Sequence, residues 1–256
     1  MKKPTFLSHS DKTYLLKEAE KTLNPARRRL LRQGLTLGGI MLLTGCDISD
    51  NEDVEKVLSR MSRFNDRVQG FLLSDRHLAP EYSAADITRP FPFNAFYGPE
   101  DIPQIDGEHY ALEVRGLVRD THRWTLPELY RMQQVSQITR HICVEGWSAI
   151  GKWGGVPFGH FLTLIGADLH AKYVSFHCAD GYYTSIDMAT ALHPQTLLAL
   201  TWDNQILPAK YGFPMKIRIP TKLGYKNPKH VLSIEVTNRF PGGYWEDQGY
   251  NWFGGS

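Results

Sequence analysis

The stretch Arg140-His141-Ile142-Cys143-Val144-Glu145-Gly146-Trp147-Ser148 decides the fold, because it ends a strand on a cysteine and then turns at a glycine. Residues 136–142 alternate like a β-strand, with Thr139 and His141 on one face. Gly146 supplies the backbone freedom for the turn. We therefore expect Cys143 at a strand end, where the positive charge of Arg140 favours the thiolate that binds metals or attacks electrophiles.

Cysteines are few, and their spacing limits their chemistry. Cys46, Cys143 and Cys178 are the only ones, and no two have C-x-x-C spacing. This pattern predicts neither a disulfide framework nor a zinc knuckle. Taken alone, Cys143 would be interpreted as a buried, inert thiol, and only its neighbours reverse that interpretation. Cys178 alternates with its neighbours like a half-buried strand residue, for which simple packing is the plain alternative.

Residues 1–45 are predicted to be an export signal. The segment Ala26-Arg27-Arg28-Arg29-Leu30-Leu31-Arg32 matches the twin-arginine pattern, with Ala and Leu in place of its usual Ser and Phe. The apolar run at residues 35–43 is too short to span a bilayer. Leu43-Thr44-Gly45-Cys46 resembles a lipobox, and an ordinary signal peptide cut elsewhere is the alternative. We expect a periplasmic protein exported by the twin-arginine route, anchored to the inner membrane if Cys46 is lipidated.

Residues 46–84 are predicted to form an N-terminal segment that is helical over residues 54–69. Residues 85–256 are predicted to form a domain that is large enough to bury a hydrophobic core. A net charge of +2 without a polybasic run gives no sign of a nucleic-acid partner.

Short elements of both kinds are predicted along this domain. Strands are expected at residues 110–116, 215–219 and 231–237, with a hairpin of residues 171–178 and 182–188 around Asp180-Gly181. Thr125 and Glu128 predict the capping box of a helix that runs to Met132, and further helices are expected at residues 158–164 and 194–200. Strands dominate and short helices are scattered among them, which is an α+β plan.

The Cys143 segment, together with Trp153-Gly154-Gly155-Val156-Pro157-Phe158, resembles the cofactor-binding centre of the sulfite oxidase-like molybdopterin oxidoreductases. That family includes the catalytic subunits of protein-methionine-sulfoxide reductases and bacterial sulfite dehydrogenases. The resemblance covers roughly residues 85–255. It implies a strand-rich α+β fold, one Mo-molybdopterin cofactor, and Cys143 as the protein's ligand to molybdenum.

Four further segments carry the same resemblance. Asn94-Ala95-Phe96-Tyr97 is similar to the pterin-contacting Asn-x-x-Tyr, although relatives often have a second Asn at Ala95. Residues 211–216 are similar to the family's x-Gly-x-Pro-x-Arg stretch, with Lys216 at the Arg position. Residues 223–229 are similar to the loop that wraps the cofactor phosphate in relatives. Residues 243–250 are similar to the C-terminal motif of the family. Cys178 falls where relatives commonly have Thr. The cofactor contacts so implied are Asn94, Tyr97, Gly98, Cys143, Cys178, Tyr211, Lys216, Asn227, Pro228 and Lys229.

Physical chemistry supports these residue types. Thiolate sulfur suits a soft, oxygen-transferring metal. Lys226 and Lys229 offer charge to a phosphate, and a solvated surface loop is the plain alternative. Glu145 is predicted to supply or accept a proton near the metal, unless it is only an exposed turn residue. An anion pocket beside the metal is predicted to use Arg140, together with Arg89, His141 and Lys152, although each is otherwise an ordinary surface charge or satisfied polar group.

Together these features predict an exported, monomeric molybdenum oxidoreductase that moves an oxygen atom to or from a small or protein-bound sulfur compound. Sulfite oxidation and the reduction of sulfoxides or methionine sulfoxide both stay open. No C-x-x-C-H motif or cysteine cluster provides a haem or iron–sulfur centre, so a separate redox partner is expected, either a membrane b-type or a periplasmic cytochrome. The alternatives are a cofactor-free binding module and a thiol-dependent enzyme that pairs Cys143 with His141 or His177.

Overall fold

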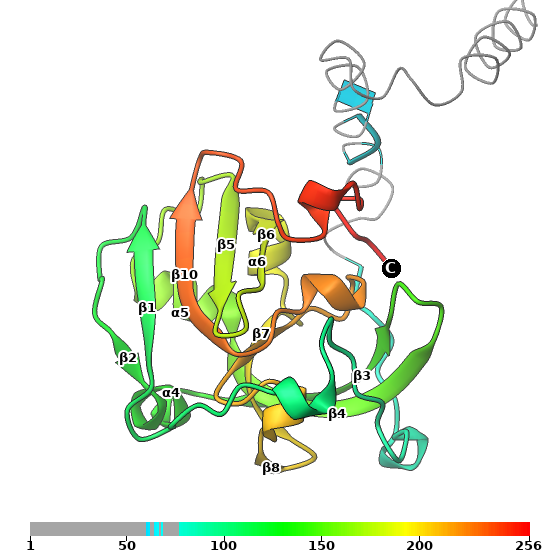
Figure 1. Cartoon of the computed structure of the whole chain (residues 1–256). Coiled ribbons are helices and arrows are strands. Elements are labelled where there is room, and N and C mark those ends of the chain that lie inside the picture. Colours follow the sequence, from blue (N-terminus) through cyan, green and yellow to red (C-terminus); the bar gives the residue numbers. More distant parts are fainter. Residues whose placement is uncertain (1–59, 62–63, 67, 69–76) are drawn as a thin grey trace, which may run out of the picture. The chain divides into compact units, whose positions relative to one another are not determined.

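The computed structural model describes residues 60–61, 64–66, 68 and 77–256 (Figure 1). The twin-arginine and lipobox-like segments lie outside the described residues. Contacts divide the chain into units Met1–Met61 and Ser62–Ser256, and the fold below is that of the second unit. The described residues of the expected leading helix, 60–61, 64–66 and 68, are helical. Within the described residues, no helix combines the length and the apolar character needed to cross a membrane.

The first of two five-stranded sheets has the order β2-β1-β10-β5-β6. Its strands are β1 (Ala111–Gly116), β2 (Trp124–Thr125), β5 (Tyr173–Cys178), β6 (Tyr183–Asp187) and β10 (Val231–Thr237). β10 lies between β1 and β5 (Figure 1), parallel to β1 with Glu113 opposite Ser233, and the remaining pairs are antiparallel. The expected hairpin is therefore present, and β10 has the expected bounds.

The second sheet is antiparallel and carries the Cys143 segment. Its strands are β3 (Val135–Ile142), β4 (Ser148–Pro157), β7 (Leu197–Trp202), β8 (Gln205–Ile206) and β9 (Lys216–Arg218), in the order β3-β4-β7-β8 with β9 beside β7. The buried face of β3 consists of Gln137, Thr139 and His141, whereas Ile138 and Ile142 are half-exposed. A polar face is thus turned inward beneath the strand end that presents Cys143.

Short helices connect the strands. They are α4 (Leu126–Arg131), α5 (Phe158–Leu164) and α6 (Met188–Leu192), with 3-10 turns η1 (Ala84–Asp86), η2 (Pro99–Asp101), η3 (Ala209–Tyr211), η4 (Gly224–Lys226) and η5 (Glu246–Gln248). The capping box before α4 is confirmed, because the backbone N–H and the hydroxyl of Thr125 both bond the Glu128 carboxylate, at 2.8 and 2.6 Å. The α+β fold class is confirmed.

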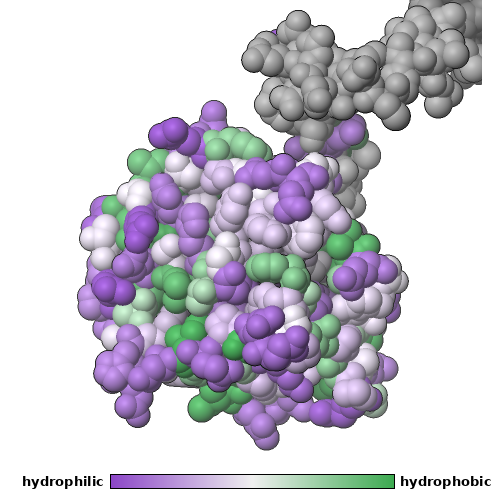
Figure 2. Space-filling view, in the orientation of Figure 1, coloured by the Kyte–Doolittle hydropathy of each residue, from purple (hydrophilic) through white to green (hydrophobic). Residues whose placement is uncertain are grey.

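Two clusters of buried side chains form the core. The larger one packs the first sheet against α5, with Leu112, Phe158, Phe161 and Ile234 fully buried. The smaller cluster is aromatic and gathers Phe91, Trp153 and Tyr211 against the second sheet. On the face seen in Figure 2, apolar residues occupy small areas scattered among polar ones, which is normal for a protein surface.

One expectation about the second sheet was wrong, and one of its strands was not predicted. Residues 194–200, expected as a helix, include the strand β7, whose apolar residues 197–200 are buried between β4 and β9. A short buried apolar run does not distinguish helix from strand. β4 was not expected at all, because glycines interrupt it. Gly155 lies so close to β7 that a Cβ there would collide with the carbonyl oxygen of Leu198, which is why this strand tolerates glycine.

Candidate functional site

Cys143 stands one residue beyond β3, in the turn expected from the sequence. The turn is closed by hydrogen bonds from Cys143 N–H to the Trp147 carbonyl, 2.9 Å, and from Gly146 N–H to the Cys143 carbonyl, 3.2 Å. Gly146 has φ 92°, a conformation that side chains rarely adopt. The cysteine is 8% exposed, so the turn presents a single, largely shielded sulfur atom to the adjoining cavity.

Glu145 and Trp147 complete the surroundings of this sulfur atom. The Cys143 thiol donates to Oε2 of Glu145 at 3.7 Å, and the indole N–H of Trp147 donates to the same oxygen at 2.9 Å. Burial raises the pKa of the Cys143 thiol, and the negative charge of Glu145 raises it further. The protein alone therefore favours the thiol, and a bound metal cation would replace its proton.

The expectation that Arg140 favours the thiolate was wrong. Its guanidinium lies on the exposed face of β3, 5.2 Å from the ring centre of Tyr82. It lines a separate cavity of about 470 Å³ together with His193 and Phe253. Arg140 and His141 are consecutive in a strand, so their side chains leave it on opposite faces.

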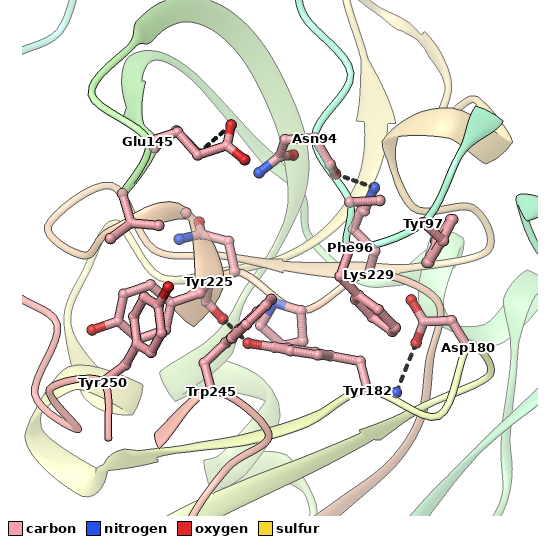
Figure 3. A pocket seen from close by; sticks show the side chains of 16 residues that line it. Asn94, Phe96, Tyr97, Glu145, Asp180, Tyr182, Tyr225, Lys229, Trp245 and Tyr250 are labelled. Atoms are coloured by element: carbon pink, nitrogen blue, oxygen red, sulfur yellow. Dashed lines mark hydrogen bonds between the residues drawn. The ribbon is translucent and has the colours of Figure 1, made fainter. Parts of the chain in front are cut away.

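Cys143 opens into a cavity of about 270 Å³ that five segments of the chain enclose. The segments are residues 94–97, the Cys143 turn, the turn between β5 and β6, residues 224–229, and the C-terminal region (Figure 3). Predicted residues that line it are Asn94, Tyr97, Cys143, Glu145, Asn227, Pro228 and Lys229. The structure thus brings together the Cys143 thiol, expected as the metal ligand, and most of the residues expected around a cofactor.

Lys229 and Asn227 hold two of these segments in place. The ammonium of Lys229 donates to the backbone oxygen of Asn94 at 2.6 Å, which ties the first segment to the fourth (Figure 3). Burial lowers the pKa of Lys229 to about 8, although the carboxylate of Asp180 opposes the shift. Asn227 accepts from Arg218 at 2.9 Å and donates to the Leu223 carbonyl at 3.0 Å, so its amide fixes the loop conformation.

Lys226 does not reach the cavity, contrary to expectation. Its ammonium lies 2.5 Å from Oε1 of Glu246, and the two side chains are only 1% and 3% exposed. Thr184 donates to the same carboxylate oxygen at 2.6 Å. Because the ammonium of Lys226 is paired with a buried carboxylate, it is not available to bind a phosphate. Of the two lysines, only Lys229 lines the cavity.

Other predicted contacts lie away from the cavity lining. Gly98 precedes η2, Cys178 is packed in the larger core, and Tyr211 donates to the Phe91 carbonyl at 2.9 Å in the aromatic cluster. Of the residues proposed for an anion pocket, Arg89 pairs with Asp203 at 2.7 Å, and neither His141 nor Lys152 lines the cavity.

A buried group of cations lies behind the cavity wall. Lys216 is 3% exposed with its ammonium 4.6 Å from the ring centre of Trp153, and the fully buried Arg218 bonds the cavity residue Asn227. Among the described residues no carboxylate forms a salt bridge with Lys216 or Arg218, and Nε of Arg218 and Nε1 of Trp153 have no hydrogen-bond partner. Burial lowers the pKa of Lys216 well below its usual range and that of Arg218 to about 9, so an anion bound nearby would stabilise the charged forms of both side chains.

His141 lies beside these cations and is itself neutral. Burial lowers its pKa well below the usual range, and Arg218, Lys216 and Lys229 lower it further. Its Nε2 lies 3.3 Å from the amide nitrogen of Asn94. Asn94 therefore donates, Nε2 accepts, and the ring proton sits on Nδ1, which has no partner among the described residues.

Sequence reasoning missed several lining residues. Asp180 and Tyr182 come from the turn between β5 and β6, and Trp245 and Tyr250 from the C-terminal region. The sequence Asp180-Gly181 predicted the turn between the two strands but did not indicate that Asp180 would line a cavity. Burial, followed by the charge of Asp180, raises the pKa of the neighbouring Tyr97. Aromatic residues in a C-terminal tail carried no motif that pointed to a cavity.

No group of three or more His, Cys, Asp or Glu side chains in the described part of the chain is arranged to hold a metal. The cavity offers a bound molecule one thiol, that of Cys143, beside Glu145 and a wall backed by buried cationic side chains.

Comparisons with known proteins agree with this geometry. Residues 99–245 match the family described as oxidoreductase molybdopterin binding domain. A protein of Azospira oryzae with the provisional name protein-methionine-sulfoxide reductase subunit YedZ1 is 66% identical over 91% of this chain and 88% of its own length.

More distant relatives are named protein-methionine-sulfoxide reductase catalytic subunit MsrP. The protein from Xanthomonas campestris is 30% identical over 54% of this chain and 48% of its own length, and the one from Ralstonia nicotianae is 27% identical over 68% and 62%. The chain therefore spans about half to three-fifths of these relatives. The sulfane dehydrogenase SoxCD from Paracoccus pantotrophus has a TM-score of 0.51 and 18% identity over 54% of this chain and 40% of its own, which shows a shared fold.

Proposed function

The chain belongs to the oxidoreductase molybdopterin-binding domain family, and we propose that this molybdopterin-dependent enzyme holds its Mo-molybdopterin in the Cys143 cavity and reduces sulfoxides. One observation carries the proposal: a single thiol faces a cavity whose wall is backed by buried, uncompensated positive charge. The names of the relatives support a sulfoxide of methionine as the substrate class.

The residues present fit this cofactor. Cys143 offers thiolate sulfur to the metal. The positive charge of Lys229, Lys216 and Arg218 favours a group that carries a phosphate. Gly224 lets its loop pack closely against two neighbouring side chains, because a Cβ there would lie 2.9 Å from Nε2 of His141 and 3.3 Å from the amide nitrogen of Asn94. The glycine thus keeps this loop and Asn94, which both line the cavity, close together.

The positions of these residues indicate which chemistry the cofactor supplies and which the protein supplies. When bound, the cofactor supplies the two-electron chemistry of oxygen transfer. Reduction of a sulfoxide consumes two electrons and two protons and releases water. The Glu145 carboxylate, which Trp147 orients beside the sulfur of Cys143, is placed to hold and deliver a proton at Oε2. The aromatic side chains of Phe96 and Trp245 line the cavity and offer a bound substrate an apolar surface.

Electrons must come from a separate protein. The relatives are named as a subunit and as catalytic subunits, which supports a partner, and we infer that the partner is a membrane b-type or periplasmic cytochrome. The twin-arginine segment supports export, and the lipobox-like Cys46 supports attachment to the inner membrane. Both features would bring the enzyme close to a membrane-bound electron donor.

The substrate class is tested with the purified enzyme. Free and protein-bound methionine sulfoxide are offered with a reduced viologen, and sulfite is offered with ferricyanide as the acceptor. We expect turnover of the sulfoxides with the viologen. Turnover of sulfite alone would reverse the proposed direction of oxygen transfer, and wild-type protein without molybdenum, from cells that make the cofactor, would reject the cavity assignment.

A further inference from the structure

Residues 241–250, here called the strap, cross the edge of the first sheet and form one wall of the cavity. Tyr244 N–H donates to the Tyr183 carbonyl at 2.8 Å, so the strap runs along the otherwise open edge strand β6. Ser185 donates to the Gly242 carbonyl at 2.6 Å. The strap is thus attached to β6 by hydrogen bonds along its length, because Thr184 and Tyr183 also bond Glu246 and Asp247.

Two strap residues, Trp245 and Tyr250, line the cavity directly. In Figure 3 they lie on the side opposite Glu145 and Asn94. The ring of Tyr244 is stacked on Phe96, with centroids 5.0 Å apart and planes 26° apart, and Phe96 comes from the first cavity segment. A cofactor in the cavity would therefore lie between the Cys143 turn and the strap.

One buried ion pair fastens the strap to the cavity segment of residues 224–229. Glu246 belongs to the strap, and Lys226 belongs to η4, whose neighbouring residues 227–229 line the cavity. Thr184 of β6 bonds the same carboxylate oxygen. The other oxygen, Oε2, is buried without a hydrogen-bond partner among the described residues. Because both charges are buried, losing one partner leaves the other uncompensated.

Glycines with positive φ lie on both sides of this fastening point. Gly242 has φ 68° and Gly249 has φ 94°. A Cβ at Gly242 would lie 2.6 Å from Oδ1 of Asp247, whereas nothing lies within 4 Å of one at Gly249. The segment between them, residues 243–248, carries the ion pair and the ring of Trp245, and its ends have the backbone freedom of hinges.

We propose that the strap opens between Gly242 and Gly249 to admit the cofactor, and that the Lys226–Glu246 pair is the latch that closes it afterwards. The inference rests on the proposed placement of the cofactor in the Cys143 cavity. It does not depend on the substrate. The latch joins the strap to the loop that carries Lys229, so closing it completes two cavity walls at once. No covalent or redox step is involved.

The test uses full-length enzyme loaded with its cofactor. Glu246→Gln keeps the size and hydrogen-bonding oxygen of the side chain but removes its charge. Glu108→Gln is the matched control, because this carboxylate is exposed and lies outside both the strap and the cavity lining. We expect Glu246→Gln to release molybdopterin, measured as pterin fluorescence in the filtrate, about tenfold or more faster than wild type. Glu108→Gln should release it at the wild-type rate.

A second measurement follows the strap itself. Amide hydrogen exchange of residues 241–250 should be faster in cofactor-free than in loaded wild-type enzyme, and Glu246→Gln should show the fast exchange even when loaded. If Glu246→Gln does not fold, the double variant Lys226→Met with Glu246→Leu replaces it. That variant removes both buried charges and with them the proposed latch, so fast exchange of residues 241–250 is again expected even when it is loaded.

Equal release rates for Glu246→Gln and wild type, or equal strap exchange with and without cofactor, would make the strap a fixed wall and overturn the proposal. Failure of the cavity assignment looks different. In that case loading would leave the exchange of residues 143–147 and 223–229 unchanged, whereas a wrong strap with a correct cavity would protect those residues and not residues 241–250.

Discussion

Arg218 donates one hydrogen bond to Asn227, 2.9 Å, and with its other terminal nitrogen bonds the hydroxyl of Thr139 and the carbonyl of Arg140. A single buried side chain thereby connects the strand that leads to Cys143 with the loop that carries Lys229. One guanidinium thus fixes the Cys143 turn relative to the loop of residues 224–229.

Replacing this guanidinium should destabilise the fold. Arg218→Met leaves buried acceptors without donors, and we expect the free energy of unfolding of the cofactor-free protein to fall by about 1–3 kcal/mol in urea titrations. Arg115→Met, which removes an exposed cation paired with Glu113, should change it by less than about 0.5 kcal/mol. Equal stability of the two variants would mean that the Arg218 contacts contribute nothing.

Cys143→Ser should separate folding from metal binding. The change is nearly isosteric, so the melting temperature should stay close to that of the wild type, while activity is lost and the electronic spectrum of the metal changes. Cys178→Ser is the control, because Cys178 is buried outside the cavity lining. An unaltered metal spectrum in Cys143→Ser would remove this residue from the coordination sphere.

Lys229 should make the stability of the cofactor-free protein depend on pH. Its pKa is about 8 in the folded protein, against an ordinary value of 10.5. Between these values the unfolded chain binds more protons, so stability should rise as pH increases from about 8 towards 10.5. The cost of burying the charge is fully present below pH 8.

Lys229→Met should flatten this rise, whereas Lys210→Met, at an exposed lysine, should preserve it. Urea denaturation at several pH values between 7 and 10 measures both. The same Lys229→Met variant should retain less cofactor than Lys210→Met after gel filtration, since the cavity loses its lining cation. A pH profile that is the same in both lysine variants would contradict the buried charge.

Glu145→Gln should lower turnover more than it lowers substrate affinity. Glutamine can still accept from the Trp147 indole but cannot carry a proton, and general acid catalysis typically contributes about 10²–10⁴-fold in rate. We expect a loss of kcat in that range with normal cofactor content. Glu108→Gln, at an exposed position, should behave as wild type, and a normal kcat in Glu145→Gln would assign proton delivery elsewhere.

Export should depend on the arginine pair. Arg27→Lys combined with Arg28→Lys should leave the enzyme in the cytoplasm, as measured by fractionation and immunoblotting. Cys46→Ala should give a soluble periplasmic form or an uncleaved precursor. A wild-type protein found soluble in the periplasm, with its N-terminus at another residue, would reject the lipid anchor but not the export route.

Local patterns predicted the elements that depend on neighbours in the sequence. The capping box of Thr125 and Glu128, the turn at Cys143 and the strand Val231–Thr237 all follow from short-range periodicity and turn chemistry. The strand at residues 197–200 could not be predicted in this way, because these residues are buried by β4 and β9, which are distant from them in the sequence.

The two lysines of residues 224–229 show why the site could only partly be predicted from the sequence. Lys226 and Lys229 carry the same charge in the same loop, yet one faces Glu246 and the other Asn94. η4 ends between them, so the two side chains leave the backbone in different directions. Glu246, which pairs with Lys226, comes close to it only because the C-terminal region folds back beside η4.

The parallel pairing of β1 with β10 constrains when the domain can form during synthesis. Strand β10 is near the end of the chain, yet it occupies the middle of the first sheet, between β1 and β5. A ribosome must deliver almost the whole chain before β1 can gain this neighbour, and contacts between such distant segments form slowly. A nascent chain stalled before Val231 would expose the facing edges of β1 and β5 to other polypeptides.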